Sequence, residues 1–125
     1  MKNPVPLIAR ILLCAIFIQS GVGKIVDPSG TQQYMAAYGM PLTSLFLIGA
    51  IVCEIFGSLS ILLGFKARLG ASLLVIFMIP TTLIFHTKLS DQVQMIMFMK
   101  NLAIIGGLLM VAYFGSGPIS LDAKK

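Results

Sequence analysis

A single acidic residue stands near the middle of a long apolar stretch. Glu54 is the only charged residue between positions 42 and 65, a stretch that as a helix, rising about 1.5 Å per residue, would cross a bilayer core of about 30 Å. An ionised carboxylate near the centre of such a helix costs on the order of 2.5–3.5 kcal/mol on insertion scales. We therefore predict that Glu54 faces the protein interior and meets a polar partner from another span.

The candidate partners are few. Lys100 and Asn101 lie well inside another apolar stretch, and Lys24 and His86 lie at the ends of two more. Helical side chains lean toward the amino terminus of their own helix, so Glu54 and Lys100 should lean toward the outer face and Lys24 into the membrane. We expect one cavity in the outer half of the bilayer lined by Lys24, Glu54, Lys100 and His86, with neutral hydrogen bonds from Ser20, Thr82, Asn101 and Gln19.

This set of side chains is compatible with two kinds of role. An acid, two bases and a titratable histidine inside a membrane are the groups that a proton relay or a quinone headgroup site would use. The alternative is purely structural: Glu54 and Lys100 form an ion pair that holds the helices together, and Lys24 snorkels to the surface. With one histidine in the chain, we predict no metal site, and no cofactor is evident beyond a quinone.

Composition fixes the class of protein. Of the 125 residues, 58% are hydrophobic and only 10% are charged, which places the chain outside the usual range of soluble domains. We predict an all-α integral membrane protein, a single four-helix transmembrane domain over residues 1–125 with spans at about 5–26, 42–65, 69–86 and 93–114. Residues 27–41 should form an external loop with a short interfacial helix over 31–38.

The net charge of +5 predicts topology rather than nucleic-acid binding. The basic residues lie at the ends of apolar stretches and form no patch interleaved with aromatic residues. Most of them fall at the two termini and in the connection between the second and third spans, namely Lys2, Arg10, Lys66, Arg68, Lys124 and Lys125. By the positive-inside rule both termini are cytoplasmic.

The first span has one face suited to packing against other helices. Arg10, Cys14, Phe17, Gly21 and Lys24 follow helical spacing and share this face. The alternative of a cleaved signal peptide is disfavoured because the apolar stretch is long enough to span the membrane. In the second span, Ala50, Gly57 and Ser58 lie on the Glu54 side and allow close approach of another backbone.

Several short motifs occur in the order found in a known family. They are Arg10-Ile-Leu-Leu, Phe17 to Ile25, Glu54-Ile-Phe-Gly57, Gly64 with Arg68, Phe85-His86, Met99 to Gly107 and Ser120-Leu-Asp122. By these the chain resembles the DoxX family of small bacterial membrane proteins, with departures at Ser58 and Ser116. The resemblance implies a four-helix bundle in the cytoplasmic (inner) membrane. Some relatives are named as the membrane subunit of a thiosulfate:quinone oxidoreductase, and others are tied to oxidative-stress complexes.

Three functions stay open at this point. The leading hypothesis is a membrane subunit or accessory of a quinone-linked redox system, with a soluble or membrane partner protein that carries the substrate chemistry, because the chain itself has no cofactor motif. The second is a small proton-coupled transporter, and the third is a non-catalytic assembly factor in which the ion pair is structural. Gly49, Cys53 and Gly57, at four-residue spacing, could also mediate a homo-oligomer.

Overall fold

The regular secondary structure is helical in residues 3–85 and 90–122, which are the ones that the computed structural model describes. The helices are α1 (Val5–Val26), α2 (Pro28–Ala37), α3 (Thr43–Leu63), α4 (Ala67–Phe85) and α5 (Gln92–Phe114). All but α2 are long and apolar enough to cross a membrane. The prediction of an all-α protein with four spans is confirmed, and these helices begin and end within two residues of the predicted positions.

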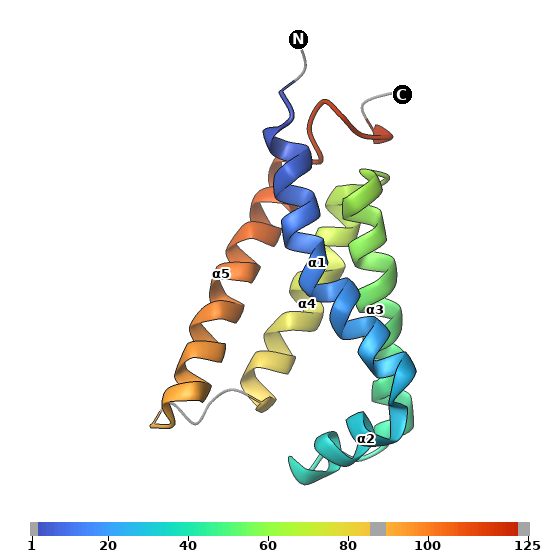
Figure 1. Cartoon of the computed structure of the whole chain (residues 1–125), viewed down its shortest axis with the longest axis vertical. Helices are drawn as coiled ribbons and strands as arrows, with labels where there is room; N and C mark the ends of the chain where they lie inside the picture. The colour runs from blue at the N-terminus through green and yellow to red at the C-terminus, as the bar shows by residue number, and fades with distance from the viewer. Residues whose placement is uncertain (1–2, 86–89, 123–125) are drawn as a thin grey trace.

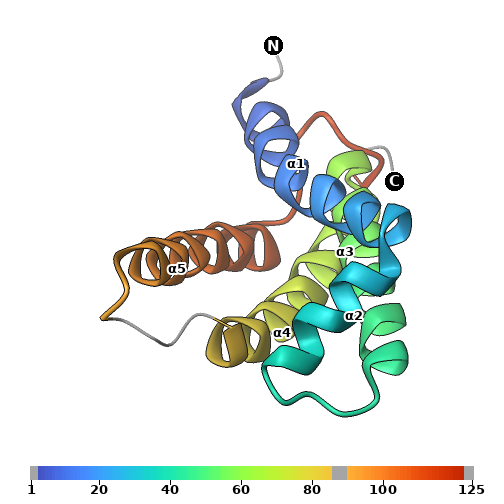
Figure 2. The same ribbon diagram turned by 60° about the horizontal axis from the view of Figure 1, so that its bottom comes forward.

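The four long helices form an open bundle. α1 packs against α3, α3 against α4 and α4 against α5, whereas α1 and α5 touch at few positions. Figures 1 and 2 show α5 standing apart from α1 over much of its length. The amino-terminal end of α1 and the tail that follows α5 lie at one end of the bundle, which we call the tail end, and α2 crosses the opposite end, which we call the α2 end. The cytoplasmic position of the tail end stays a prediction.

Small residues set the distance between helices. The buried residues of α1 are four of the five predicted to share its packing face, Arg10, Cys14, Phe17 and Gly21, while Lys24, the fifth, is 19% exposed. In α3, a Cβ on Gly57 would lie 2.7 Å from the buried Leu74 side chain of α4, so a larger residue there would force the two helices or Leu74 to shift. Gly57 therefore allows close packing of α3 against α4 within one chain.

Helix α2 begins earlier than the predicted range of 31–38. The Asp27 carboxylate accepts a hydrogen bond from Gly30 N at 3.1 Å, and Pro28 occupies the first turn, where a missing N–H costs nothing. Tyr34 of α2 and Tyr38, the residue after its end, contact the ring of Phe85 at the end of α4, with ring centroids 5.2 and 4.9 Å away. Burial and the hydrogen bond to Tyr38 raise the pKa of Tyr34 to about 12.

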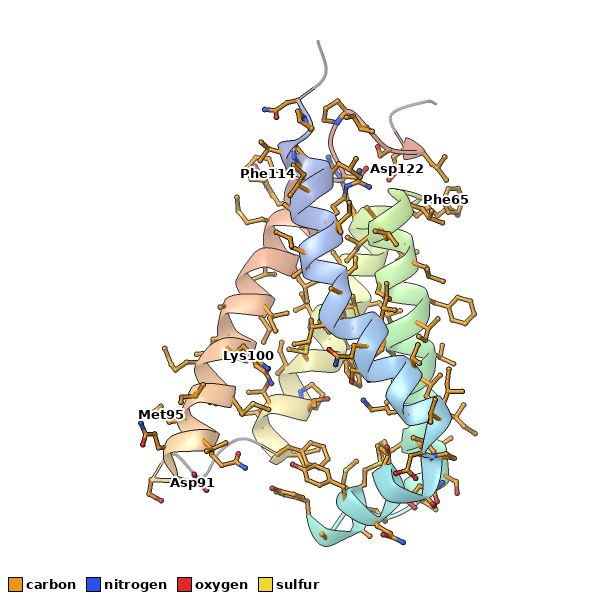
Figure 3. The ribbon with its side chains drawn as sticks, in the orientation of Figure 1. Phe65, Asp91, Met95, Lys100, Phe114 and Asp122 are labelled. Atoms are coloured by element: carbon orange, nitrogen blue, oxygen red, sulfur yellow. The ribbon has the colours of Figure 1, made fainter. Side chains whose placement is uncertain are left out.

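Hydrogen bonds of Arg10 and Asp122 connect the helices and the tail at the tail end of the bundle. The buried Arg10 guanidinium donates to the carbonyl oxygens of Ile61 and Leu62, at 3.0 and 3.1 Å, and to that of Ile119 in the tail. Asp122 accepts from two backbone N–H groups at the start of α4, those of Lys66 at 2.8 Å and Ala67 at 3.1 Å. Arg10 is therefore a buried structural residue, which the positive-inside interpretation of its charge did not predict. Figure 3 shows Asp122 at this end of the bundle.

Candidate functional site

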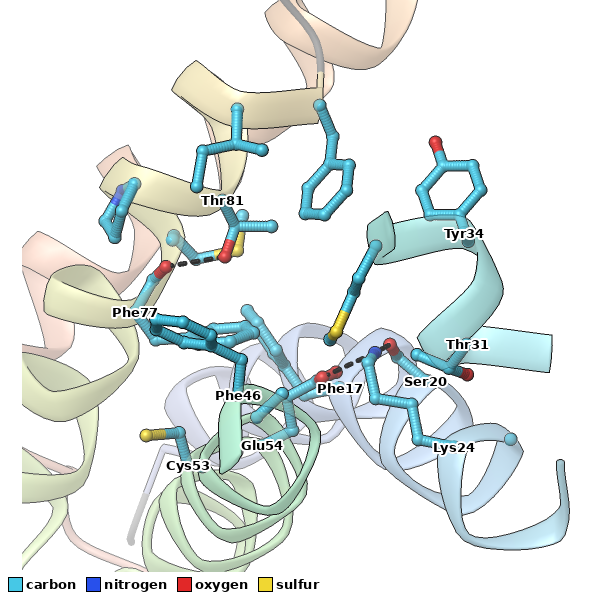
Figure 4. A pocket seen from close by; sticks show the side chains of 18 of the residues that line it. Phe17, Ser20, Lys24, Thr31, Tyr34, Phe46, Cys53, Glu54, Phe77 and Thr81 are labelled. Atoms are coloured by element: carbon cyan, nitrogen blue, oxygen red, sulfur yellow. Dashed lines mark hydrogen bonds and ion pairs between the residues drawn. The ribbon is translucent and has the colours of Figure 1, made fainter. Parts of the chain in front are cut away.

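The buried acid of α3 pairs with the lysine of α1. The Lys24 Nζ atom lies 2.6 Å from Glu54 Oε1, and Lys24 also donates to the Ser20 hydroxyl at 2.7 Å (Figure 4). The Glu54 side chain is 2% exposed and that of Lys24 is 19% exposed. Glu54 therefore faces the protein interior, as the cost of a charge in lipid predicts.

The sequence of α1 brings the two helices close at this level. Ser20 and Lys24 are four residues apart and so lie on one face of α1. Gly21, between them, has no side chain to separate the helices, because a Cβ there would lie 2.6 Å from the Ile55 side chain of α3 and 3.5 Å from Glu54 Cβ. The close approach places the ammonium within reach of the carboxylate.

The ion pair lies in the wall of a large cavity. This hollow, which we call the Lys24–Glu54 cavity, measures about 950 Å³ and lies toward the α2 end, with walls from all five helices of the described chain. Small-molecule sites in proteins typically measure about 300–1,000 Å³. Its walls are largely apolar, with Phe46, Phe77 and Met78 among them, and its polar lining includes Ser20, Lys24, Thr31, Tyr34, Glu54, Thr81, Lys100 and Asn101.

Helix α5 supplies the other polar groups expected at this site. Lys100 is an exposed residue that nevertheless lines the cavity, and Figure 3 shows it pointing from α5 toward α4. The expected Glu54–Lys100 ion pair is not found: among the described residues, the ion pair of Glu54 is with Lys24. The reason is the order of packing, since α1 lies against α3 whereas α5 is held against α4.

Asn101 and Thr82 bind one another. The Asn101 side-chain amide donates to the Thr82 hydroxyl at 3.1 Å, and both residues are buried at the contact of α5 with α4. Asn101 also lines the cavity, where α4 contributes Thr81 rather than Thr82. His86 lies outside the described residues.

Thr81 and Tyr34 are lining residues that the sequence analysis did not select. Thr81 donates to the Phe77 carbonyl at 2.8 Å, one turn back in the helix that contains Pro80. A threonine inside a helix commonly donates to the carbonyl four residues back, so this bond follows from the helical position of Thr81. Tyr34 lines the cavity because α2 folds across this end of the bundle, which no local motif specifies.

Comparison with known proteins gives the family. The sequence model of DoxX matches residues 5–87. The chain belongs to the DoxX family. A second model, described as the SURF4 family, matches residues 59–125. The DoxX chain is 45% identical to the inner membrane protein YqjF of Escherichia coli over 93% of its length and 88% of that protein.

A second relative is also an inner membrane protein. The inner membrane protein YphA of Escherichia coli is 41% identical, over 94% of this chain and 88% of that protein. No solved structure matches the chain. With four helices able to cross a membrane, this DoxX protein is a multi-pass protein of the bacterial inner membrane, as predicted.

Proposed function

We propose that this DoxX-family protein binds a quinone in the Lys24–Glu54 cavity and acts as a membrane subunit or accessory of a quinone-linked redox system. The observation that carries the proposal is the position of the ion pair. Lys24 and Glu54 do not lie in a close-packed core but in the wall of a hollow of about 950 Å³. A purely structural pair needs no such space beside it.

The lining has the groups that a quinone ring requires. The two carbonyl oxygens of a quinone accept hydrogen bonds. Lys24, Lys100 and Asn101 are donors that line the same cavity. Phe46 and Phe77 provide apolar walls for the flat ring. A bound quinone would supply two-electron, two-proton chemistry, for which Lys24 holds a proton at Nζ and Glu54 balances its charge.

A partner protein completes this proposal. The sequence contains no cofactor motif, so an electron donor carried by a soluble or membrane partner would deliver electrons to the ligand. The chain's own contribution is to bind and orient the ring and to hold protons near it. Catalytic residues in the strict sense are therefore not assigned to this chain.

The test measures quinone binding directly. Purified protein in lipid nanodiscs is titrated with ubiquinone and menaquinone, and co-purified quinone is extracted and quantified. We expect the wild type to bind one of the two, and Glu54→Gln and Lys24→Met each to bind it at least about tenfold more weakly, because a charge-assisted hydrogen bond to the ring is weakened or lost.

A steric variant guards against loss of folding in the charge variants. Thr81→Phe adds volume to the cavity wall and leaves the ion pair in place, while Thr81→Val removes the same hydroxyl without adding volume. We expect Thr81→Phe alone to lose binding. Absence of quinone binding in the wild type, or full binding in Thr81→Phe, would overturn the proposal; substrate-driven proton flux in liposomes without quinone binding would favour the transporter instead.

A further inference from the structure

A second hollow lies between α1 and α5. This α1/α5 groove measures about 760 Å³ and is lined almost entirely by residues of these two helices. Its walls are mainly aliphatic, with Leu12, Leu13 and Ile16 from α1 and Ala103, Ile104 and Gly107 from α5. It exists because α1 and α5, the first and last long helices, make few contacts with each other.

The groove adjoins the Lys24–Glu54 cavity. Ile16, Lys100 and Ile104 line both hollows, so Lys100 stands at their junction. From there the groove follows α5 to Phe114 at the tail end, about 21 Å at 1.5 Å per residue. A cavity with an ion pair in its wall near one end of the bundle thus adjoins a long, mainly aliphatic groove that runs toward the other end.

The two hollows together match the shape of one class of ligand. We propose that the ligand of the Lys24–Glu54 cavity carries a single long apolar chain, prenyl or acyl, which lies in the α1/α5 groove while its polar head lies at the ion pair. This inference rests on the proposed function and adds to it the part of the ligand that enters the groove. Lys100, at the junction, is placed to contact the boundary between head and chain.

A helix from a second copy fits the groove less well. Gly107 of α5 lies close to α1, since a Cβ there would be 3.6 Å from Leu13 Cδ1. A helix about 10 Å across could not enter between α1 and α5 without separating them at this contact. A single hydrocarbon chain is thin enough to lie alongside it.

The ligand's hydrocarbon chain should contribute moderately to the binding affinity. When this hydrocarbon chain moves from lipid into the groove it gains no hydrophobic free energy, because both surroundings are apolar, and only close packing favours the groove. Blocking the groove should therefore weaken binding of a long-chain ligand by about fivefold to tenfold and leave binding of the bare head unchanged.

Two adjacent glycines provide a matched pair of variants. Gly107 lines the groove, whereas Gly106 is exposed and a Cβ there would meet nothing within 4 Å. Gly107→Leu fills the groove, and Gly106→Leu makes the same change in helix propensity on the lipid-facing side. Each variant and the wild type are titrated in nanodiscs with a polyprenyl quinone and with the same ring lacking the chain, at matched mole fractions in the lipid.

Four outcomes decide the matter. Loss of affinity for the long-chain quinone alone, and only in Gly107→Leu, supports the inference. Equal affinity of Gly107→Leu and wild type for the long-chain quinone overturns the inference while the proposed function stands. A change of oligomeric state in Gly107→Leu, with ligand affinity unaltered, also overturns it and assigns the groove to a second copy. Failure of the wild type to bind either ligand overturns the proposed function itself.

Discussion

Removal of Lys24 should destabilise the protein much more than removal of Glu54, although both belong to one ion pair. Lys24→Met leaves a carboxylate that is 2% exposed with no other cation at ion-pair distance among the described residues. Removing one partner of a buried pair typically costs about 3–5 kcal/mol. We expect a loss of about 3 kcal/mol in the free energy of unfolding.

Glu54→Gln leaves Lys24 without its carboxylate partner, and an unpaired charge costs less free energy at Lys24 than at Glu54. The Lys24 side chain is 19% exposed, still donates to Ser20, and can extend its ammonium toward the membrane surface. The glutamine oxygen also remains as an acceptor. We expect a loss of about 1 kcal/mol. The double variant contains no unpaired charge and should lose about 1–2 kcal/mol, well below the sum of the single losses.

The measurement is a double-mutant cycle on reversible unfolding in mixed micelles, followed by circular dichroism. Lys100→Met is the matched control, because it removes an exposed ammonium from another span and should change stability by less than about 0.5 kcal/mol. Two results would refute the reasoning. One is additivity of the single losses within about 0.5 kcal/mol, and the other is a Lys100→Met loss as large as that of Lys24→Met.

Three further variants test the packing around the site. Gly64→Ala should lose more than about 1 kcal/mol, because Gly64 has φ 69° and a Cβ would overlap Ser120; wild-type stability would contradict the tail contact. Asp122→Ala removes the acceptor of two backbone N–H groups at the start of α4 and should cost about 0.5–2 kcal/mol, with faster hydrogen exchange of those amides; unchanged exchange would show that the cap is dispensable. Thr82→Val leaves the buried Asn101 amide without its acceptor and should cost about 1–3 kcal/mol in the same unfolding assay, so a neutral result would mean that water or another group replaces the hydroxyl.

Much of the fold could be predicted from the sequence because lipid imposes simple rules. A hydrocarbon core of fixed thickness sets the length of each apolar stretch, and the four spans follow from that. The helical period alone identified the buried face of α1, including Arg10 and Cys14. The cost of a charge in lipid alone predicted that Glu54 faces inward.

What only the tertiary structure decided is which helices are neighbours. Depth and direction placed Lys24 and Lys100 in one cavity with Glu54, which both do line, but the ion pair expected from the sequence joined Glu54 to Lys100 rather than to Lys24. The choice between them depends on glycine contacts that hold α1 against α3 and on the packing of α5 against α4. Side-chain spacing determines the face and the depth of a residue on its own helix. Which residue it meets on another helix depends on the packing contacts along the whole length of both helices, and no local sequence motif specifies those contacts.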